Sequence, residues 1–441
     1  MISASKYDIT VVKVEKEDFP AAISIYYKIK HLTFKSKISY SSIQKWSEVQ
    51  QKCSAEQFDI LTGTIILFDS MRFFTLGAEK ITLPEQYAVP EFVKEVWHII
   101  FRNSYAEWRY FSNMQYPSAD YPKINCLDKA YDFSIEKISS SDEVYDKKLL
   151  TNGGGKDSLF SMLELTRNKE RFDIYQAYLP LGGDTQLQKK LLDRLTGKIA
   201  AHNDIVEVFI EDDFTHLSLA ELRRINPEAV CEQIDFFVGH TANYVGFFPL
   251  IIQHGYNEVL FNIESTSDRI MQWWKHAEQD GIELHEPINH QYCKSTEYRN
   301  YISQLFSRLF PSFVFSGFNS SLQDKNDTEI YKDIISHDAN LLTYTHSCNF
   351  VKPWCGKCPK CCFCYLMMNA YVEKEIADRT FGLKEGDVNP FDDIDNADHW
   401  KSLLNEDEVA WECVAPTDEC LEALKKAHKK GIALNLSKYV Q

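Results

Sequence analysis

The sequence lacks long apolar runs, a signal-like N-terminus and an excess of basic charge. None of its apolar runs approaches the ~20 residues that a membrane-spanning helix needs. Residues 1–19 contain no basic stretch followed by an apolar one, so we expect no signal peptide. The formal net charge is −16, from 48 Lys and Arg against 64 Asp and Glu. This balance argues against nucleic acid and membrane surfaces as partners, and the oligomeric state stays open.

The composition is that of a soluble globular protein with many free thiols. Hydrophobic residues make up 44% and charged residues 25% of the chain, as in soluble globular proteins. The length of 441 residues indicates about two to four domains. The sequence has 12 cysteines and no recognisable secretion signal. We therefore expect a reducing, cytoplasmic location, in which cysteines bind metal or take part in catalysis rather than form a disulfide scaffold.

Glycine is scarce, at 17 residues, yet three glycines are consecutive at 153–155. An apolar run over 149–151 precedes them, and leucines and Phe160 recur at helical spacing after Ser158. This order predicts a strand, a tight glycine loop and the N-terminus of a helix.

Such a loop suits a phosphate group. Glycines allow a ligand to approach the backbone closely, and the positive end of a helix favours an anion. The spacing fits neither G-x-x-x-x-G-K-[ST] nor G-x-G-x-x-G. The alternative is a glycine-rich turn that only connects a strand to a helix.

The first part of the chain, residues 1–145, is predicted to be a β-rich domain that ends in a helix. Residues 8–40 alternate between apolar and polar side chains, which predicts antiparallel strands, and we expect the apolar residues 59–77 to continue them. Apolar residues at helical spacing predict a helix over 90–113. Nothing in this domain indicates chemistry of its own.

Residues 146–345 are predicted to form an α/β domain with a parallel sheet and helices on both faces. Strand patterns alternate with helix patterns, and the predicted strands after the loop are 172–179, 205–210 and 258–264, with helices at 185–201, 217–225 and 241–253. Ligands bind beyond the carboxyl ends of such strands, where Asn262 and Glu264 lie. The polar segment 265–300 is predicted to be a functional loop, although His290 alone is more often structural.

A cysteine cluster follows in residues 346–372. Cys355, Cys358 and Cys361 form overlapping C-x-x-C units, and Cys348 lies seven residues before them. Four thiolates suffice for a closed, structural Zn²⁺ site. Buried free cysteines and an iron–sulfur cluster are the alternatives, but the spacing differs from ferredoxin runs. Residues 373–441 are predicted to form a C-terminal helical segment.

The glycine loop resembles that of the PP-loop ATP pyrophosphatases, which have a HUP-like fold and split ATP into AMP and pyrophosphate. Loop and cysteines together resemble 7-cyano-7-deazaguanine synthase and, more closely, the UDP-N-acetylmuramoyl-L-alanyl-L-glutamate epimerase family. The second similarity covers nearly the whole chain and extends to these motifs: Gly239-His240, Asn262-x-Glu264, 289–295, 347–349, 354–361 and 412–414. Cys293 stands where a serine is expected.

The resemblance implies an ATP- and Mg²⁺-dependent isomerase of peptidoglycan precursor synthesis. It adenylates the terminal L-Glu of UDP-N-acetylmuramoyl-L-Ala-L-Glu, and the activated Cα then loses and regains its proton to give D-Glu. The implied nucleotide-binding residues are Asn152, Gly153, Gly154, Gly155, Asp157 and Ser158.

The resemblance also implies roles for other side chains. Lys156 would neutralise phosphate charge and Asp157 would hold Mg²⁺. Asn262, Asn289 and Ser295 would bind the substrate, and Lys294 and His290 would contact the substrate or pyrophosphate. The proton-transfer residue would be Glu264, His290 or Cys293.

Two other functions remain open at this point. One is a PP-loop ligase or amidating enzyme that activates another carboxylate. The other is a non-catalytic nucleotide-binding protein that keeps the fold. Substrate-dependent release of AMP, an amide product and exchange of the α-proton distinguish the three.

Overall fold

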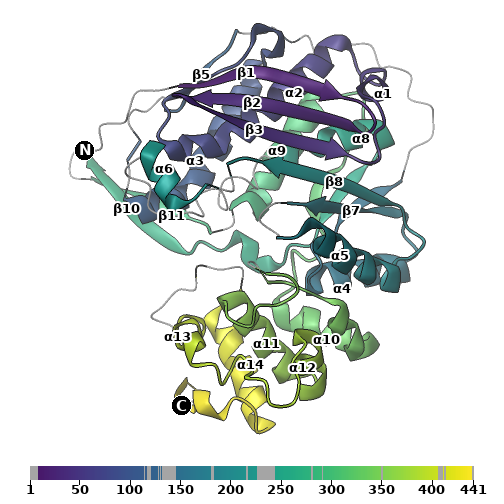
Figure 1. Cartoon of the computed structure of the whole chain (residues 1–441), viewed down its shortest axis with the longest axis vertical. Helices are drawn as coiled ribbons and strands as arrows, with labels where there is room; N and C mark the ends of the chain where they lie inside the picture. The colour runs from purple at the N-terminus through teal and green to yellow at the C-terminus, as the bar shows by residue number, and fades with distance from the viewer. Residues whose placement is uncertain are drawn as a thin grey trace. The chain divides into compact units, whose positions relative to one another are not determined.

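A computed structural model of the chain describes residues 8–113, 115–116, 121–127, 129, 131, 146–179, 183–214, 217–225, 244–279, 282–290, 292–348, 351–405, 411 and 414–439. It confirms the α/β class (Figure 1). The main sheet has ten strands in the order β12-β9-β6-β7-β8-β3-β2-β1-β4-β5, and β10 and β11 form a second sheet.

The strands are β1 Asp8–Glu17, β2 Ala21–Ile29, β3 Leu32–Tyr40, β4 Lys80–Thr82, β5 Lys123–Asn125, β6 Lys148–Thr151, β7 Phe172–Tyr178, β8 Ile205–Asp212, β9 Glu258–Phe261, β10 Gln272–Gln279, β11 Ile282–Ile288 and β12 Gly317–Ser320. The helices are α1 Trp46–Gln50, α2 Ala55–Asp69, α3 Glu91–Ser112, α4 Lys156–Arg167, α5 Thr185–Ile199, α6 Leu219–Ile225, α8 Phe248–His254, α9 Thr296–Leu309, α10 Asp327–Asp338, α11 Pro359–Tyr371, α12 Lys374–Phe381, α13 Ala397–Leu404 and α14 Thr417–Lys429.

The chain forms two compact units, and neither is continuous in sequence. The first contains Met1–Lys148, Val206–Val259 and Ile270–Asn319, and the second contains Leu149–Ile205, Leu260–Arg269 and Ser320–Gln441. The domain boundaries predicted at residues 145, 345 and 372 stay predictions.

The N-terminal strands of the first unit are antiparallel, as the alternating pattern predicts. β1 pairs with β2 and β2 with β3, with Tyr27 opposite Phe34. β3 also pairs antiparallel with β8, where Ile38 lies opposite Ile210. The N-terminal strands therefore share a sheet with a strand of the α/β region, which the sequence patterns did not indicate.

The prediction of strands over residues 59–77 is wrong. This segment forms the helix α2 and a 3₁₀ helix, Ser70–Leu76. A capping box begins α2, since Ser54 Oγ accepts from the backbone N–H of Gln57 and the Gln57 side chain accepts from the N–H of Ser54. The helix is buried on nearly every side, so its apolar residues show no helical period.

The polar segment 265–300 is not the long loop that was predicted. It contains a β-hairpin, β10 and β11, and the start of α9. The two strands pair antiparallel from Gln272 opposite Ile288 to Gln279 opposite Ile282, with an irregularity between Lys275 and Ala277. Polar side chains dominate both strands, so the apolar alternation that marks a half-buried strand is missing.

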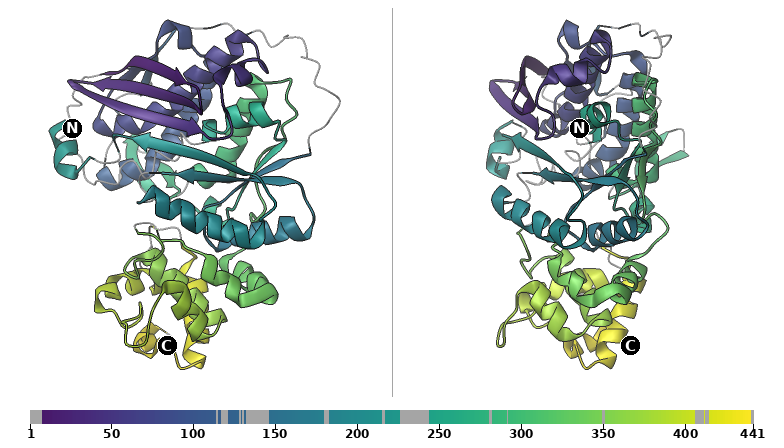
Figure 2. Two further views of the ribbon diagram at one scale, coloured as in Figure 1. Left: turned by 45° about the vertical axis from the view of Figure 1, so that its right-hand side comes forward. Right: turned by 90° about the vertical axis from the view of Figure 1, so that its right-hand side faces the viewer.

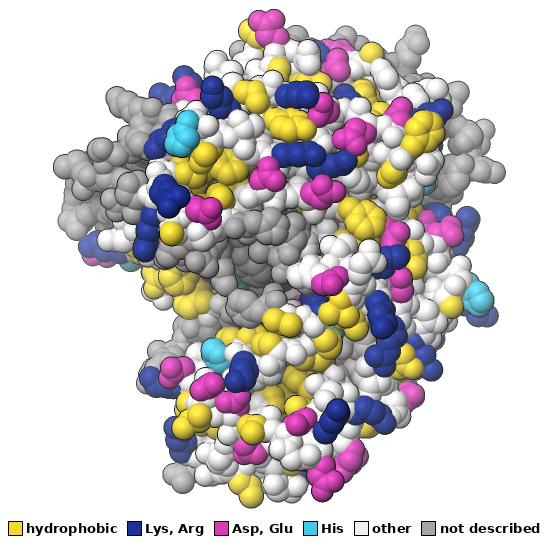
Figure 3. All heavy atoms as spheres, viewed as in Figure 1, with side chains coloured by type: hydrophobic (Ala, Val, Ile, Leu, Met, Phe, Trp, Pro, Cys, Tyr) yellow, Lys and Arg dark blue, Asp and Glu magenta, His cyan; other side chains and the backbone are white. Residues whose placement is uncertain are grey.

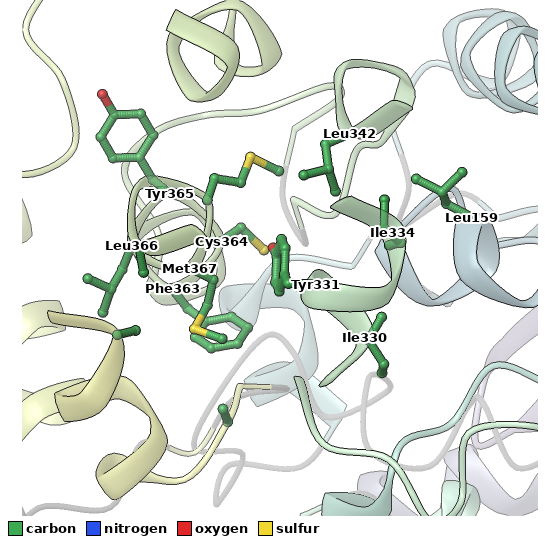
Figure 4. Packing of buried hydrophobic residues seen from close by; sticks show 14 of the residues in the cluster. Leu159, Ile330, Tyr331, Ile334, Leu342, Phe363, Cys364, Tyr365, Leu366 and Met367 are labelled. Atoms are coloured by element: carbon green, nitrogen blue, oxygen red, sulfur yellow. The ribbon is translucent and has the colours of Figure 1, made fainter. Parts of the chain in front are cut away.

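The second unit combines strand–helix units with a group of C-terminal helices (Figure 2). The predictions for 149–168, 172–179 and 185–201 are confirmed by β6 with α4, by β7 and by α5. Helices α4, α10 and α11 share one hydrophobic core (Figure 4), whose members include Leu159, Ile330, Tyr331, Ile334, Leu342, Phe363 and Cys364. The helix after the glycine loop is thus anchored on the C-terminal helices.

Within the described ranges, no helix is both long and apolar enough to cross a membrane. Acidic and basic side chains are interspersed over the face of the molecule that Figure 3 shows.

Candidate functional site

The glycine loop is a short turn between β6 and α4 that is held by its own side chains. The side chain of Asn152 accepts a hydrogen bond from the N–H of Gly154 at 3.0 Å, and Ser158 Oγ accepts from the N–H of Gly153 at 2.9 Å. Asn152 is buried, and its Nδ2 donates to Thr196 Oγ1 at 3.1 Å. The predicted nucleotide-binding residues therefore form one rigid turn.

Two of the glycines are required by neighbouring protein atoms. Gly154 has a φ of +80°, and a Cβ there would lie 2.2 Å from ring atoms of His346. A Cβ on Gly155 would lie 2.7 Å from Ser347 Oγ. At Gly153 the nearest atom would be Ser158 Oγ, at 4.0 Å, so this glycine alone leaves room at the loop. The close approach of a ligand was expected to explain all three glycines, but neighbouring protein atoms already explain Gly154 and Gly155.

Lys156, the first residue of α4, is 4% exposed and lies between carboxylates. Its Nζ is 2.6 Å from Asp157 Oδ1 and 2.5 Å from Asp327 Oδ1. Burial disfavours the charge, but Asp157, Asp327 and Glu264 outweigh it and raise the pKa of Lys156 well above its ordinary value. The lysine thus neutralises carboxylates of the protein, a role that differs from the predicted contact with phosphates.

Asp157 and Asp327 are buried to different degrees. The side chain of Asp157 is 22% exposed, and burial raises its pKa although Lys156 opposes the shift. Asp327 is 1% exposed and was missed by the sequence reasoning. Its only sequence signal is its place at the start of α10, where Asn326 and Glu329 form a capping box.

Asn262 lies at the glycine loop, as its place after a strand suggests. Strand β9 ends at Phe261, earlier than predicted, and the Asn262 side chain follows. Asn262 Nδ2 donates to the carbonyl of Thr151 and lies 3.2 Å from Ser158 Oγ. Glu264 Oε1 accepts from Thr266 Oγ1 at 3.1 Å and acts electrostatically on Lys156.

His290 belongs to the first unit and is paired with a buried carboxylate. Its Nδ1 lies 2.6 Å from Oε1 of Glu107, and the two residues are 9% and 2% exposed. Glu107 lies on α3, a helix in which the sequence reasoning placed no functional residue. A carboxylate on one ring nitrogen orients an imidazole for work at the other.

Some residues close to His290 in the sequence have structural roles. Ser295 is the N-cap of α9 and accepts from the N–H of Tyr298 at 3.1 Å. The carbonyl of Lys294 accepts from Arg299 at 3.2 Å, and Cys293 and Asn289 are half-buried. The functional roles assigned to these four residues stay predictions. Gly239, His240 and Glu412 lie outside the described residues.

Four cysteine sulfurs converge as the spacing predicts. The Sγ atoms of Cys348, Cys355, Cys358 and Cys361 all lie within 4.8 Å of one another. Backbone N–H groups of Val351, Lys357 and Cys361 point to three of these sulfurs at 3.3–3.4 Å. Four convergent thiols with N–H donors are compatible with a structural Zn²⁺ site, the chemistry predicted from the spacing. Cys362 and Cys364 lie in the hydrophobic core, as expected.

This cluster gives a direct prediction about metal content. Replacing Cys355 with Ala should lower bound zinc well below about one ion per chain and lower the melting temperature, because a structural site needs all four ligands. Cys364→Ala, a core cysteine outside the cluster, should keep its zinc. Elemental analysis of both purified variants decides it, and equal zinc in the two would contradict the assignment.

The comparison with protein families identifies the C-terminal part of the chain. Residues 342–434 match the model described as the MurL C-terminal domain. A search of curated proteins finds no match. The matched segment contains the four cysteines, α11–α14 and the residues that contact Gly154 and Gly155. Over residues 342–434, about a fifth of its length, the chain is therefore similar to the C-terminal domain of the MurL family.

Proposed function

We propose that the protein is an ATP-dependent epimerase that inverts the terminal L-Glu of UDP-N-acetylmuramoyl-L-Ala-L-Glu. The observation that carries the proposal is the contact of the glycine loop with the matched domain. The N–H of His346 donates to the carbonyl of Gly154 at 2.8 Å, and both residues belong to the second unit. The turn predicted to bind an anion is thus in direct contact with the segment that matches the MurL C-terminal domain, and this contact supports the proposal.

The chemistry requires activation because a carboxylate makes its α-proton very weakly acidic. A carboxylate oxygen of the glutamate attacks the α-phosphorus of ATP, and pyrophosphate leaves with the electron pair of the broken P–O bond. The acyl adenylate withdraws electrons, so a side-chain base removes the Cα proton. Protonation on the opposite face gives the D configuration, and water then releases AMP. A positioned base supplies about 10²–10⁴ in rate, so activation must supply most of the remainder.

Residues of the second unit suit the first half of this reaction. The N-terminus of α4, which no side chain caps, would offer the N–H groups of its first turn to phosphate oxygens, while those of Gly153 and Gly154 hold the loop in shape by donating to Ser158 Oγ and Asn152 Oδ1. Asp157 would hold Mg²⁺ together with those phosphates, since Mg²⁺ is usually bound through one or two carboxylates and substrate oxygens. Bound there, the ion would screen phosphate charge, and Lys156 keeps the carboxylate of Asp157 in place.

For the second half, His290 is the candidate base that the contacts favour. Glu107 holds its Nδ1 and orients the ring, and Nε2 is the nitrogen through which the imidazole would exchange the proton. Glu264 instead lies close enough to Lys156 to raise its pKa, which favours a role in charge balance.

Formation of AMP tests the proposal. The protein is incubated with ATP, Mg²⁺ and UDP-N-acetylmuramoyl-L-Ala-L-Glu, with ammonia in a parallel reaction, and the products are separated. AMP and the D-Glu product are expected, and Asp157→Asn should lower the rate by about 100-fold or more, as loss of transition-state charge stabilisation does. Glu164→Gln, which removes an ion pair with Arg167 on the same helix, should leave the rate unchanged.

An amide product without inversion would instead indicate a ligase. Absence of AMP with this dipeptide and with other carboxylic acids would contradict the activation scheme itself.

A further inference from the structure

The segment Thr345–Ser347 crosses the glycine loop just before the first cysteine of the cluster, Cys348. Its backbone is tied to the loop by the hydrogen bond from the N–H of His346 to the carbonyl of Gly154, at 2.8 Å. The ring of His346 fills the space that a Cβ on Gly154 would need. The loop and this segment are therefore hydrogen-bonded and packed together, although about 190 residues separate them in sequence.

The hydroxyl of Ser347 lies beside the N-cap residue of α4. The N-cap of α4 is Gly155, and no side chain caps the helix. A Cβ on Gly155 would lie 2.7 Å from Ser347 Oγ, so this hydroxyl lies close to the place where an N-cap side chain would begin. A serine hydroxyl can donate a hydrogen bond, as do the N–H groups of the first turn.

The side chain of His346 gives a second indication that a ligand binds here. It is 1% exposed and its ring interacts with the backbone carbonyl of Tyr344, yet Nδ1 has no partner at hydrogen-bond geometry among the described residues. Buried polar atoms are nearly always paired, so one that is not needs an explanation. A nucleoside triphosphate has phosphate oxygens that accept and hydroxyls that donate, so it can satisfy this nitrogen in either tautomer.

We propose that Ser347 and His346 are nucleotide-contacting residues that complete the phosphate site at the N-terminus of α4. The proposal rests on the function proposed above and adds two ligand contacts to it. Ser347 Oγ donates to a phosphate oxygen beside the first-turn N–H groups, and the His346 ring, which packs against Gly154, contacts the same nucleotide.

The test measures binding of ATP and of inorganic tripolyphosphate by calorimetry. Ser347→Ala removes only the hydroxyl, and His346→Phe keeps a ring against Gly154 but removes its nitrogens. Thr343→Ala is the control, because this hydroxyl, four residues before Ser347, donates to a local carbonyl, that of Asn340. Zinc content and melting temperature are measured for every variant, since a damaged cysteine cluster would weaken binding indirectly.

Ser347→Ala should weaken both ligands by roughly 10-fold or more, the usual effect of losing a hydrogen bond to a charged group. His346→Phe should weaken ATP to a similar degree, with wild-type zinc content, and His346→Gln should recover part of the loss. If His346→Phe loses zinc, Ser347→Ala alone decides the question.

The contrary results are equally distinct. Wild-type affinity in Ser347→Ala, or a loss accompanied by lost zinc or a lower melting temperature, would overturn the proposal. A wild-type protein that binds ATP without epimerising the dipeptide would overturn the proposed function and leave this inference standing. A wild-type protein that binds no ATP would overturn both.

Discussion

Gly154→Ala should abolish nucleotide-dependent activity and destabilise the second unit. The residue has a φ of +80°, a conformation that costs an L-residue about 1–2 kcal/mol. The new Cβ would also meet the His346 ring at 2.2 Å, so the loop or the 345–347 segment must move. We expect AMP formation to fall by about 100-fold or more, because misplacement of a binding group by about 1 Å can cost that much.

Gly153→Ala is the matched control within the same loop. The nearest atom to its Cβ would be Ser158 Oγ at 4.0 Å, so the folded protein should tolerate the substitution. Its stability should be that of the wild type. Lower ATP affinity at unchanged stability would show that the nucleotide approaches Gly153. If Gly154→Ala were as active and stable as Gly153→Ala, the contact with His346 would not matter for the loop.

Lys156→Met should strongly destabilise the second unit. It leaves the buried carboxylate of Asp327 and the partly buried one of Asp157 without their cation, and breaking a buried pair in this way costs about 3–5 kcal/mol. The free energy of unfolding, measured with urea, is the readout. Lys325→Met is the control, because its ion pair with Asp333 is partly exposed and should contribute about 0–1 kcal/mol.

The pH dependence of this penalty has a definite sign. The folded-state pKa of Lys156 is raised above its ordinary value, so its stabilisation is fully present below that value and is lost only as the pH rises through the higher, folded pKa. The penalty of Lys156→Met should therefore not shrink between pH 6 and pH 8. In the double variant with Asp327→Asn the two losses should not add, because both belong to one ion pair. Additive losses would show that the two groups act independently.

Sequence patterns sufficed where local rules decide the structure. The glycine loop between β6 and α4 follows from glycine conformation and helix start signals, and the cysteine cluster follows from C-x-x-C spacing. The antiparallel pairing of β1, β2 and β3 follows from alternation. Each of these features depends on residues close together in the chain.

The patterns failed where the partner of a residue is distant or where burial hides the period. Helix α2 is buried almost all round, so its apolar run resembles a buried strand. Asp327 becomes part of the site only because α10 packs beside α4 and brings it to Lys156. Position 154 has no room for a side chain because the ring of His346, about 190 residues away in sequence, lies there. No local pattern in the loop predicts that contact.

The central claim is that ATP activates a glutamate so that its α-proton can exchange. The most direct measurement incubates the protein with UDP-N-acetylmuramoyl-L-Ala-L-Glu, ATP and Mg²⁺ in deuterated water, and follows AMP and α-deuterium in the same samples. The account predicts that deuterium enters the glutamate Cα only when ATP is present, and that AMP accumulates with it. Deuterium uptake without ATP, or AMP formation with no deuterium at Cα, would contradict it.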